Sequence, residues 1–336
     1  MSAATLGSSF EQEIREQPAV WERLARSDIA ASLARSVTGE VVLLGSGSSL
    51  FVAQLGALAL RRRKVDAHAL AATEARLDHA AYQRKTVVAI SQSGRSTDLL
   101  VALDVLHPKR IVALTNTARS PLGDVADLVL DVSAGVERAV PASKSVTASV
   151  VAVLWAASIV GGHAGRDPQV LSATAQDVER WLQDGPLGVR EAAEAIARRQ
   201  HVAVLGSDYG LPVAREVALK LKEASYLHAE GFSAGEFRHG SVSMVDDSFT
   251  VIGIADRDAV PAVARPLHDL ERSGALRYEI GTSDIAGVPK LGPAVKEAYN
   301  TLGWLVTGQL LALYAARARG IDCDAPRGLT KALVEE

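Results

Sequence analysis

Two stretches of this chain share one layout: a continuous apolar run, a turn rich in serine and glycine, and a helical pattern. In the first, residues 41–44 are apolar and lead into Gly45-Ser46-Gly47-Ser48-Ser49. In the second, residues 86–90 lead into Ser91-Gln92-Ser93-Gly94-Arg95-Ser96-Thr97-Asp98. Short, wholly apolar runs are typical of strands that are buried on both faces of a parallel sheet. The chain is therefore expected to be an α/β protein.

The turn at residues 91–98 combines small polar side chains with one glycine at the expected carboxyl end of a buried strand. From such a position, hydroxyl groups, backbone N–H groups and the dipole of the following helix can all point at one anion. The pattern therefore predicts a phosphate-binding turn. The alternative is an ordinary strand-to-helix turn in which Ser96 or Thr97 caps the helix.

Further strands and helices alternate along the chain. Strands are expected at residues 65–70, 110–114 and 127–132, and the layout restarts with strands at 201–205, 250–255 and 277–281. Such alternation implies doubly wound parallel sheets, whose ligands bind at the carboxyl ends of the strands. Both serine-rich turns should then lie at the same edge of the first sheet. The predicted architecture is two tandem domains, each a parallel sheet flanked by helices.

Changes in pattern along the chain divide this architecture into consecutive parts. We predict an N-terminal helical segment at 1–38, a first domain at 39–165, a helical linker at 166–198, a second domain at 199–320 and a C-terminal tail at 321–336. The linker is polar and is punctuated by Gly185 and Pro186.

Composition argues against several classes of protein. The chain has 336 residues, 48% of them hydrophobic and 22% charged, as expected of a globular protein with two cores. Its net charge of -3 argues against a nucleic-acid partner, because there is no basic excess to neutralise phosphates. The cluster Arg61-Arg62-Arg63-Lys64 ends an apolar helical run, where cations at a helix C-terminus are the favoured explanation.

No feature of the sequence favours a membrane partner or export. Residues 145–162 are uncharged but include serines, a threonine and two closing glycines, so a buried core helix is favoured over a membrane span. Residues 1–10 lack the basic start and long apolar core of an export signal. The single cysteine, Cys323, excludes an internal disulfide framework. A cytoplasmic protein is the expectation.

The helix expected at residues 211–224 carries two stripes. Its apolar stripe consists of Val213, Val217, Leu221 and Ala224. Beside it, Glu216, Lys220 and Glu223 line up at spacings of four and three residues. A charged site near the core is one interpretation, and a solvent-exposed row of paired charges is the other.

The stretch that follows this helix is dense in ionisable groups, namely His228, Glu230, Glu236 and His239. Glu236 and His239 are three residues apart, which raises the question of a metal site. No spacing typical of a closed metal site is present, so no metal is expected.

Together these stretches resemble the sugar isomerase (SIS) family, in particular the isomerase half of glucosamine-6-phosphate synthase and its free-standing relatives. The resemblance covers nearly the whole chain from residue 40 onward. It rests on Gly47-Ser48-Ser49, Ser91-Gln92-Ser93-Gly94 with Ser96, Ala218-Leu219-Lys220-Leu221-Lys222-Glu223, His228-Ala229-Glu230, Gly235-Glu236 with His239-Gly240, and Pro326-Arg327-x-Leu329-x-Lys331. Several separate motifs in the right order make this resemblance specific.

The resemblance implies a binding site for a sugar 6-phosphate. The phosphate group would be held by Ser91, Gln92, Ser93 and Ser96, with Ser46, Gly47, Ser48 and Ser49 at the same edge. Val140 and Ala142 would face the sugar hydroxyls.

The resemblance also implies a catalytic set of Glu223, His239, Lys331 and Lys220. Glu223 would move a proton between C1 and C2 of the sugar, a task that suits a partly buried carboxylate. His239 would assist ring opening, and in the synthase the matching histidine comes from the neighbouring subunit. The lysine that matches Lys331 forms an imine with the ketose in the synthase. A homodimer with shared active sites, and no cofactor, is therefore expected.

The chain also departs from the synthase pattern. The synthase has an N-terminal glutaminase domain with a cysteine nucleophile, whereas this chain begins Met1-Ser2 and has only Cys323, so it is not expected to be a glutamine-dependent synthase by itself. Arg95 stands where the synthase motif has an acid, and Ser241 replaces a proline; both changes concern substrate choice.

The expected function is that of a phosphosugar isomerase or amino-sugar-phosphate deaminase. Such an enzyme would convert glucosamine 6-phosphate, or a close relative, to fructose 6-phosphate with release of ammonia. The alternatives are a fructosamine-6-phosphate deglycase, a plain hexose-phosphate aldose–ketose isomerase, and a non-catalytic phosphosugar sensor.

Overall fold

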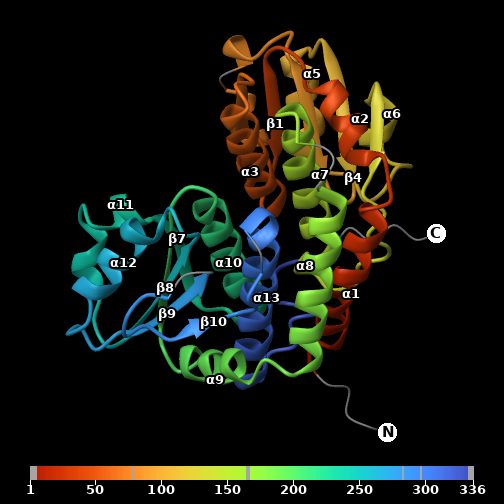
Figure 1. The fold of residues 1–336 in the computed structure, drawn as a ribbon. Helices are drawn as coiled ribbons and strands as arrows, with labels where there is room; N and C mark the ends of the chain where they lie inside the picture. The colour runs from red at the N-terminus through yellow and green to blue at the C-terminus, as the bar shows by residue number, and fades with distance from the viewer. Residues whose placement is uncertain (1–5, 78, 164–166, 282–283, 296, 332–336) are drawn as a thin grey trace, which may run out of the picture. The chain divides into compact units, whose positions relative to one another are not determined.

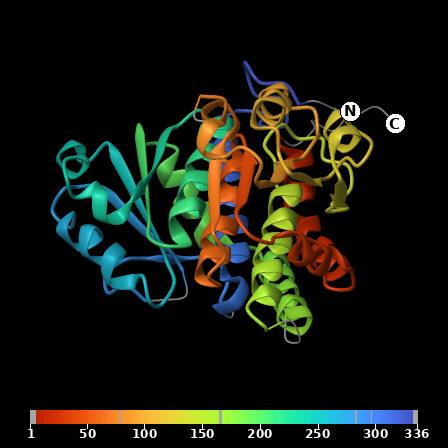
Figure 2. The same ribbon diagram turned by 90° about the horizontal axis from the view of Figure 1, so that it is seen from above.

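The apolar runs form the strands of two five-stranded sheets, in each of which all the strand pairs are parallel. The computed structural model describes residues 6–77, 79–163, 167–281, 284–295 and 297–331. Helices cover both faces of each sheet (Figure 1; Figure 2). The predicted α/β class with two tandem parallel-sheet domains is confirmed.

The first sheet has the strand order β2-β1-β3-β4-β5. Its strands are β1 (Val41–Gly45), β2 (Ala67–Ala71), β3 (Thr86–Ser91), β4 (Arg110–Thr115) and β5 (Leu128–Asp131). This is a doubly wound order in which the chain reverses its direction of winding between β1 and β3. All five strands were predicted, to within a few residues at their ends. The point of reversal is the usual place for a ligand in such a sheet.

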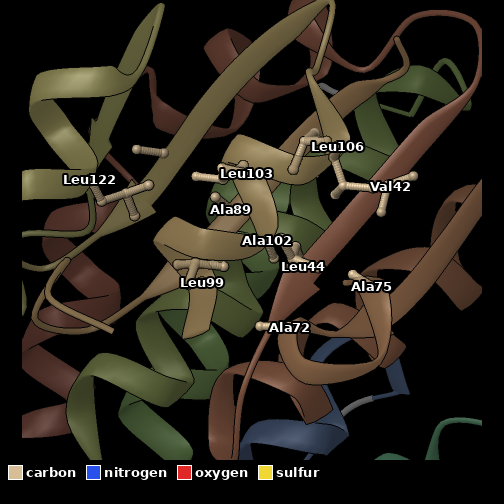
Figure 3. Packing of buried hydrophobic residues seen from close by; sticks show 12 residues of the cluster. Val42, Leu44, Ala72, Ala75, Ala89, Leu99, Ala102, Leu103, Leu106 and Leu122 are labelled. Atoms are coloured by element: carbon tan, nitrogen blue, oxygen red, sulfur yellow. The ribbon is translucent and has the colours of Figure 1, made fainter. Parts of the chain in front are cut away.

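Alternate side chains of these strands pack on opposite faces of the sheet, as the two-residue period of a strand requires. On one face, Val42, Leu44 and Ala89 pack with Leu99 and Leu103 of α5 (Thr97–Leu106), and with α4 (Ala72–Ala75) and α6 (Pro121–Val125) (Figure 3). On the other face, Leu43 and Val88 border the same small space as side chains of α2 (Ile29–Ser36), α3 (Ser48–Arg62) and α7 (Lys144–Val160).

Helix α7 is buried along most of its length, including the uncharged stretch from Ser145 to Ala157. It packs against both α2 and α3. The prediction of a buried core helix at this place is confirmed. None of the helices in the described part of the chain has the length and apolar character needed to cross a membrane.

The second sheet repeats the arrangement, with the order β7-β6-β8-β9-β10. Its strands are β6 (His201–Gly206), β7 (His228–Ser233), β8 (Phe249–Ala255), β9 (Leu276–Gly281) and β10 (Lys290–Leu291). Strands β6, β8 and β9 were predicted. The edge strands β7 and β10 were not, and the stretch dense in ionisable groups is therefore partly a strand.

The long helices beside this sheet pack on one another. Helix α10 (Gly210–Ser225) packs against α13 (Asn300–Ala318), which also packs against α9 (Leu187–Ile196). Helices α11 (Ala234–Phe237) and α12 (Val260–Asp269) belong to a second cluster, built around residues such as Phe237 and Leu267. Single turns of 3-10 helix stand at His79–Ala81, Ser241–Met244 and Glu297–Tyr299.

The described residues divide into two compact units, which we name after their sheets. The first-sheet unit comprises the described residues of Ala19–Glu137 and Lys144–Ser172. The second-sheet unit comprises the described residues up to Pro18, then Arg138–Ser143, and those of Ala173–Lys331. Helices α1 (Ser8–Leu24) and α8 (Asp167–Gln183) each contribute residues to both units.

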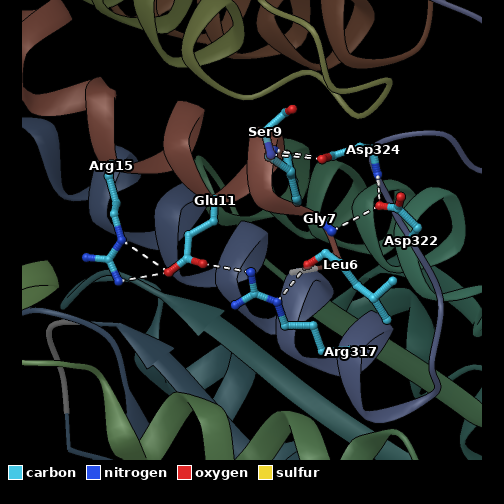
Figure 4. Close-up of polar contacts among 9 residues, drawn as sticks. Leu6, Gly7, Ser9, Glu11, Arg15, Arg317, Asp322 and Asp324 are labelled. Atoms are coloured by element: carbon cyan, nitrogen blue, oxygen red, sulfur yellow. Dashed lines mark hydrogen bonds and ion pairs between the residues drawn. The ribbon is translucent and has the colours of Figure 1, made fainter. Parts of the chain in front are cut away.

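Within the second-sheet unit, the start of α1 is held by the C-terminal tail. Asp324 accepts hydrogen bonds from the backbone N–H groups of Ser9 and Phe10, both at 2.8 Å, and Asp322 accepts one from Gly7 at 3.0 Å (Figure 4). The first N–H groups of a helix have no partner inside the helix, and a carboxylate at this end is favoured by the helix dipole. The tail therefore caps α1. Residues 332–336 of the predicted tail lie outside the described residues.

Candidate active site

The two serine-rich turns lie at the point where the first sheet reverses its winding. Strands β1 and β3 are hydrogen-bonded neighbours, with Leu44 opposite Ala89, and their carboxyl ends lead into the two turns. Residues 46–49 and residues 91–96 therefore come together at one edge of the sheet, as the sequence predicts. The N-termini of α3 and α5 point to this same edge, and helix N-termini favour anions.

The turn between β3 and α5 is shaped by its own serines. Ser91 Oγ accepts the N–H of Gly94 at 3.1 Å, and Ser93 Oγ accepts the N–H of Arg95 at 3.3 Å. Gly94 has a φ of 62°, and a Cβ at this position would stand 2.1 Å from Oγ of Ser120, so only glycine fits. Because a hydroxyl that accepts one hydrogen bond still has its own proton, Ser91 and Ser93 remain able to donate to an anion.

Ser96 stands at the N-cap position of α5, but its side chain makes no capping hydrogen bond. The alternative explanation, in which Ser96 serves the turn merely as a helix cap, is therefore not what the structure shows. Ser96 is half-buried.

The turn between β1 and α3 is very tight. A Cβ on Gly45 would stand 2.6 Å from the backbone carbonyl carbon of Ser49, so the strand can turn into the helix this closely only at glycine. Ser46 and Gly47 are exposed, and Ser48 and Ser49 are half-buried. The first turn of α3 contains no acidic residue that would repel an anion.

A buried glutamate that the sequence did not reveal holds the start of α7. Glu137 is 3% exposed and accepts hydrogen bonds from both the backbone N–H of Ser145, at 3.2 Å, and its hydroxyl, at 2.7 Å. The hydroxyl of Ser145 is thus engaged by this carboxylate. In the loop at residues 132–143, Glu137 is the last residue that belongs to the first-sheet unit. Its hydrogen bonds thus attach this part of the loop to the start of α7.

Residues 138–143 belong to the second-sheet unit and are held there by backbone contacts. Buried Glu13 accepts hydrogen bonds from the N–H groups of Arg138 and Ala139, and the N–H of Val140 donates to the carbonyl of Asp324 at 3.2 Å. Lys331 Nζ donates to the carbonyl of Ala139 at 2.6 Å. The structure therefore brings Lys331 beside Val140, two of the predicted site residues, while Ala142 follows half-buried in the same segment.

Helix α10 carries the row of charged residues Glu216, Lys220 and Glu223, and most of this row is buried. Lys220 Nζ lies 2.5 Å from Oε2 of Glu223 and 3.6 Å from Oε1 of Glu216. The side chains of Lys220 and Glu216 are 1% and 2% exposed, whereas that of Glu223 is 22% exposed. The interpretation as a solvent-exposed row of charges is therefore wrong. A buried ammonium group needs carboxylate partners, and here it has them on two turns of its own helix.

The end of α10 is fixed by the C-terminal tail. Tyr226, in the left-handed conformation that ends the helix, accepts the N–H of Arg327 on its hydroxyl at 2.7 Å. The guanidinium group of Arg327 lies over the tyrosine ring, 4.4 Å from its centre. The tail that carries Lys331 is thus attached three residues beyond Glu223. The contact between Tyr226 and Arg327 was not predicted from the sequence, in which an aromatic residue at a helix end was the only local signal for it.

His239 lies apart from the other predicted catalytic residues. It is exposed in the turn after α11, where its backbone N–H donates to the backbone carbonyl of Glu236 at 2.9 Å. In the described part of the chain, no hydrogen bond or ion pair joins its side chain to Glu223, Lys220 or Lys331. A site that uses both His239 and Glu223 therefore stays a prediction. Within the described ranges, no three His, Cys, Asp or Glu side chains are grouped so that they could hold a metal ion.

Known proteins share both the sequence pattern and the fold. The model of the SIS domain matches residues 36–159 and 195–280. The isomerizing glutamine–fructose-6-phosphate aminotransferase of Sulfolobus acidocaldarius is 30% identical over an alignment of 308 residues, which covers 89% of this chain and 50% of that protein. This chain spans about half the length of the curated relatives that it matches.

Two solved structures have the same fold. Glucosamine-6-phosphate deaminase of Thermotoga maritima superimposes with a TM-score of 0.80 at 24% identity, over 96% of this chain and 98% of that one. Tagatose-6-phosphate ketose/aldose isomerase of Escherichia coli superimposes with a TM-score of 0.81 at 21% identity, over 98% and 97%. With the family match covering more than half of its residues, this chain belongs to the SIS domain family.

Proposed function

We propose that this chain is a sugar-phosphate isomerase of the deaminating kind, which converts glucosamine 6-phosphate to fructose 6-phosphate and ammonia. The observation that carries the proposal is the partly exposed carboxylate of Glu223, held by a buried lysine. A carboxylate that is accessible on one side and fixed on the other is the kind of group that serves as a general base.

The serine turns of the first-sheet unit are proposed to bind the 6-phosphate. They offer the hydroxyls of Ser91, Ser93 and Ser96 and the N-termini of two helices at one edge of the sheet. Hydroxyls, backbone N–H groups and helix dipoles together favour a phosphate over a neutral group. The 6-phosphate group would contribute to binding of the substrate but would take no part in the reaction.

The proposed reaction is a proton transfer followed by hydrolysis. In the open-chain sugar, Glu223 removes the proton from C2 and returns it to C1, while the C1 oxygen gains a proton and the amine loses one. The aldose with its amine on C2 is thereby converted into a ketose imine. Water then adds to the carbon–nitrogen double bond, ammonia leaves, and fructose 6-phosphate remains. One water is consumed for each ammonia released, so the reaction needs no cofactor. His239 is assigned to ring opening and Lys331 to the imine stage, both on the family resemblance.

Similar proteins support this reaction and also its nearest alternative. The deaminase of Thermotoga maritima supports release of ammonia, and the ketose/aldose isomerase of Escherichia coli supports an isomerisation without it. Both reactions use a base that moves a proton between C1 and C2, so Glu223 serves either one. A deglycase acting on fructosamine 6-phosphate and a non-catalytic sensor are the remaining candidates.

A panel of substrates tests the proposal. The purified chain is incubated with glucosamine 6-phosphate, galactosamine 6-phosphate, fructosamine 6-phosphate, glucose 6-phosphate and tagatose 6-phosphate, and both ammonia and ketose are measured. Free glucosamine and the Glu223→Gln variant serve as controls. Equal amounts of ammonia and ketose from an amino-sugar phosphate alone are the expected result.

The other outcomes separate the alternatives. Ketose from glucose 6-phosphate without ammonia identifies a plain isomerase, and cleavage of fructosamine 6-phosphate alone identifies a deglycase. Binding of a sugar phosphate with no turnover of any of them identifies a sensor. Each of these results contradicts the proposed deaminase.

A further inference from the structure

The amino edge of the first sheet contains a cleft of about 520 Å³, at the opposite ends of the strands from the serine turns. Clefts of this volume are typical of sites for small molecules. The residues that line it precede or begin strands β1, β3, β4 and β5, and all belong to the first-sheet unit. None of them is among the predicted site residues.

The lining of this amino-edge cleft is polar and carries an excess of positive charge. Four of its side chains are cationic, Arg84, Lys85, Lys109 and Arg110, and two are acidic, Glu40 and Asp127. The cations come from neighbouring strands: the carbonyl of Lys85 accepts the N–H of Lys109 at 3.0 Å, and Thr86 stands opposite Arg110 in the sheet. Two pairs of cations therefore lie side by side.

Both acids are already engaged. Glu40 Oε2 lies 3.3 Å from Nζ of Lys85, and Asp127 Oδ2 accepts the backbone N–H of Ile111 at 2.7 Å. In contrast, the side chains of Arg84, Lys109 and Arg110 make no hydrogen bond or ion pair within the described part of the chain. These three cations thus face a single carboxylate that no cation among the described residues pairs, that of Asp127, which leaves an excess of two positive charges in the cleft.

Arg84 is placed by an uncommon backbone conformation. Its φ is 58°, in the left-handed region that residues with a side chain rarely adopt. The residue stands directly before Lys85 and the start of β3, at the lip of the amino-edge cleft. Residues with such rarely adopted backbone conformations occur more often at binding sites than elsewhere.

This cleft and the serine turns are separate places. Strand β3 is six residues long, and a strand rises about 3.3 Å per residue, so the two edges of the sheet are about 20 Å apart. One sugar phosphate cannot reach both. The cleft is therefore not part of the proposed active site.

We propose that the amino-edge cleft binds a small molecule that carries at least two phosphate groups. An excess of two positive charges, carried by cations at the starts of two strands, suits two anionic groups better than one. Guanidinium and ammonium groups are the usual partners of phosphate. Among the described residues that line the cleft, none is aromatic, so they offer no surface for stacking a base. A net charge of -3 for the whole chain also disfavours nucleic acid. The proposal does not depend on the proposed function.

Titration of inorganic pyrophosphate by isothermal calorimetry, at constant ionic strength, tests the proposal. The test variant is Arg84→Gln/Lys109→Gln, which removes two of the three cations. The matched control is Arg26→Gln/Arg180→Gln, which removes the same charge from two exposed positions outside the cleft, one in the turn after α1 and one on α8. A third variant, Ser93→Ala/Ser96→Ala, reports binding at the serine turns. Circular dichroism establishes that each variant is folded, and the single variants Arg84→Gln and Lys109→Gln replace the double variant if it is not.

We expect pyrophosphate to bind the wild type, the control and the serine variant alike, and the cleft variant about tenfold or more weakly. Orthophosphate should bind the cleft more weakly than pyrophosphate. The proposal is overturned if the wild type does not bind pyrophosphate, if the cleft variant binds it as tightly as the control does, or if only the serine variant loses binding. It is equally overturned if orthophosphate binds as tightly, or if an RNA oligonucleotide displaces pyrophosphate at lower concentration.

Discussion

The ammonium nitrogen of Lys220 lies 2.5 Å from a carboxylate oxygen of Glu223, yet the lysine is fully buried and the glutamate is not. The lysine therefore cannot meet a ligand in bulk solvent, whereas the glutamate can. Lys220 holds the carboxylate of Glu223 from inside, and Glu216 on the preceding turn is a second carboxylate near the lysine, 3.6 Å away.

Replacing Lys220 tests this arrangement. Lys220→Met removes the buried cation that lies beside two carboxylates, one of them fully buried, so the free energy of unfolding should fall by about 3–5 kcal/mol. Urea unfolding measures the change. The double variant Glu216→Gln/Lys220→Met should lose less than Lys220→Met alone, because it also removes the charge of the buried carboxylate that lost its lysine. Unchanged stability in the single variant would show that the lysine is not needed as a partner.

Glu223→Gln tests the proposed base. Glutamine keeps the shape of the side chain but cannot accept a proton, so kcat should fall about a hundredfold or more while KM stays close to that of the wild type. Steady-state assays with glucosamine 6-phosphate measure both constants. Glu230→Gln, an exposed glutamate on β7, serves as the control. Normal turnover in Glu223→Gln would exclude Glu223 as the base.

The serine turn should recognise the phosphate group. Ser93→Ala/Ser96→Ala is expected to raise KM for the phosphorylated substrate and to reduce the increase in Tm that glucosamine 6-phosphate causes. Ser32→Ala, on α2 and outside the turn, should change neither value. Free glucosamine should not raise the Tm of any of these proteins. Equal stabilisation by the free and the phosphorylated sugar would contradict a phosphate site at this turn.

Mixed dimers test whether one active site uses two subunits, with Glu223 from one chain and His239 from the other. Equal amounts of Glu223→Gln and His239→Ala chains are unfolded, mixed and refolded, which should give about half heterodimers. In each heterodimer one site carries both changes and the other neither, so about one quarter of wild-type activity should return. Heterodimers that show only the residual activity of the parents would mean that His239 acts within its own chain.

The environment of Glu11 predicts how the free energy of unfolding depends on pH. Burial alone would raise the pKa of the Glu11 carboxyl, but the hydrogen bonds and charges of Arg317 and Arg15 outweigh it and hold the pKa below its usual value. A lowered pKa contributes stability that is present above the usual value for glutamate and is lost as the pH falls through the lowered pKa. Unfolding of wild type and Glu11→Gln should therefore differ at neutral pH and converge in acid. A difference that persists in acid would contradict the ion pair as its source.

Strands in the middle of each sheet are readable from the sequence because burial on both faces leaves only apolar residues in them. Strand β7 lacks this signal, because it pairs only with β6 and leaves His228 and Glu230 exposed while Ala229 is buried. Strand β10 has two residues and no pattern at all. The two edge strands of the second sheet are thus missed because they lack the burial on both faces that makes inner strands visible, whereas β2 and β5, the edge strands of the first sheet, were predicted.

The candidate site divides in a similar way. The serine turns are local motifs, so the sequence predicts them together with their edge of the sheet. Glu13 and Ala139 are 126 residues apart, and Tyr226 and Arg327 are 101 apart, so no local pattern records that they meet. The row of charges on α10 is visible in the spacing, but its burial is not, because it depends on how α10 packs with distant parts of the chain.

The chain passes from one compact unit to the other after Pro18, Glu137, Ser143 and Ser172. A chimera made with a relative at a single junction in the middle of the sequence would take Ala139 from one parent and its partner Lys331 from the other. The two halves of the sequence therefore cannot be exchanged independently. In a chimera that keeps this contact, the segment Arg138–Ser143 has to come from the same parent as the C-terminal half of the chain.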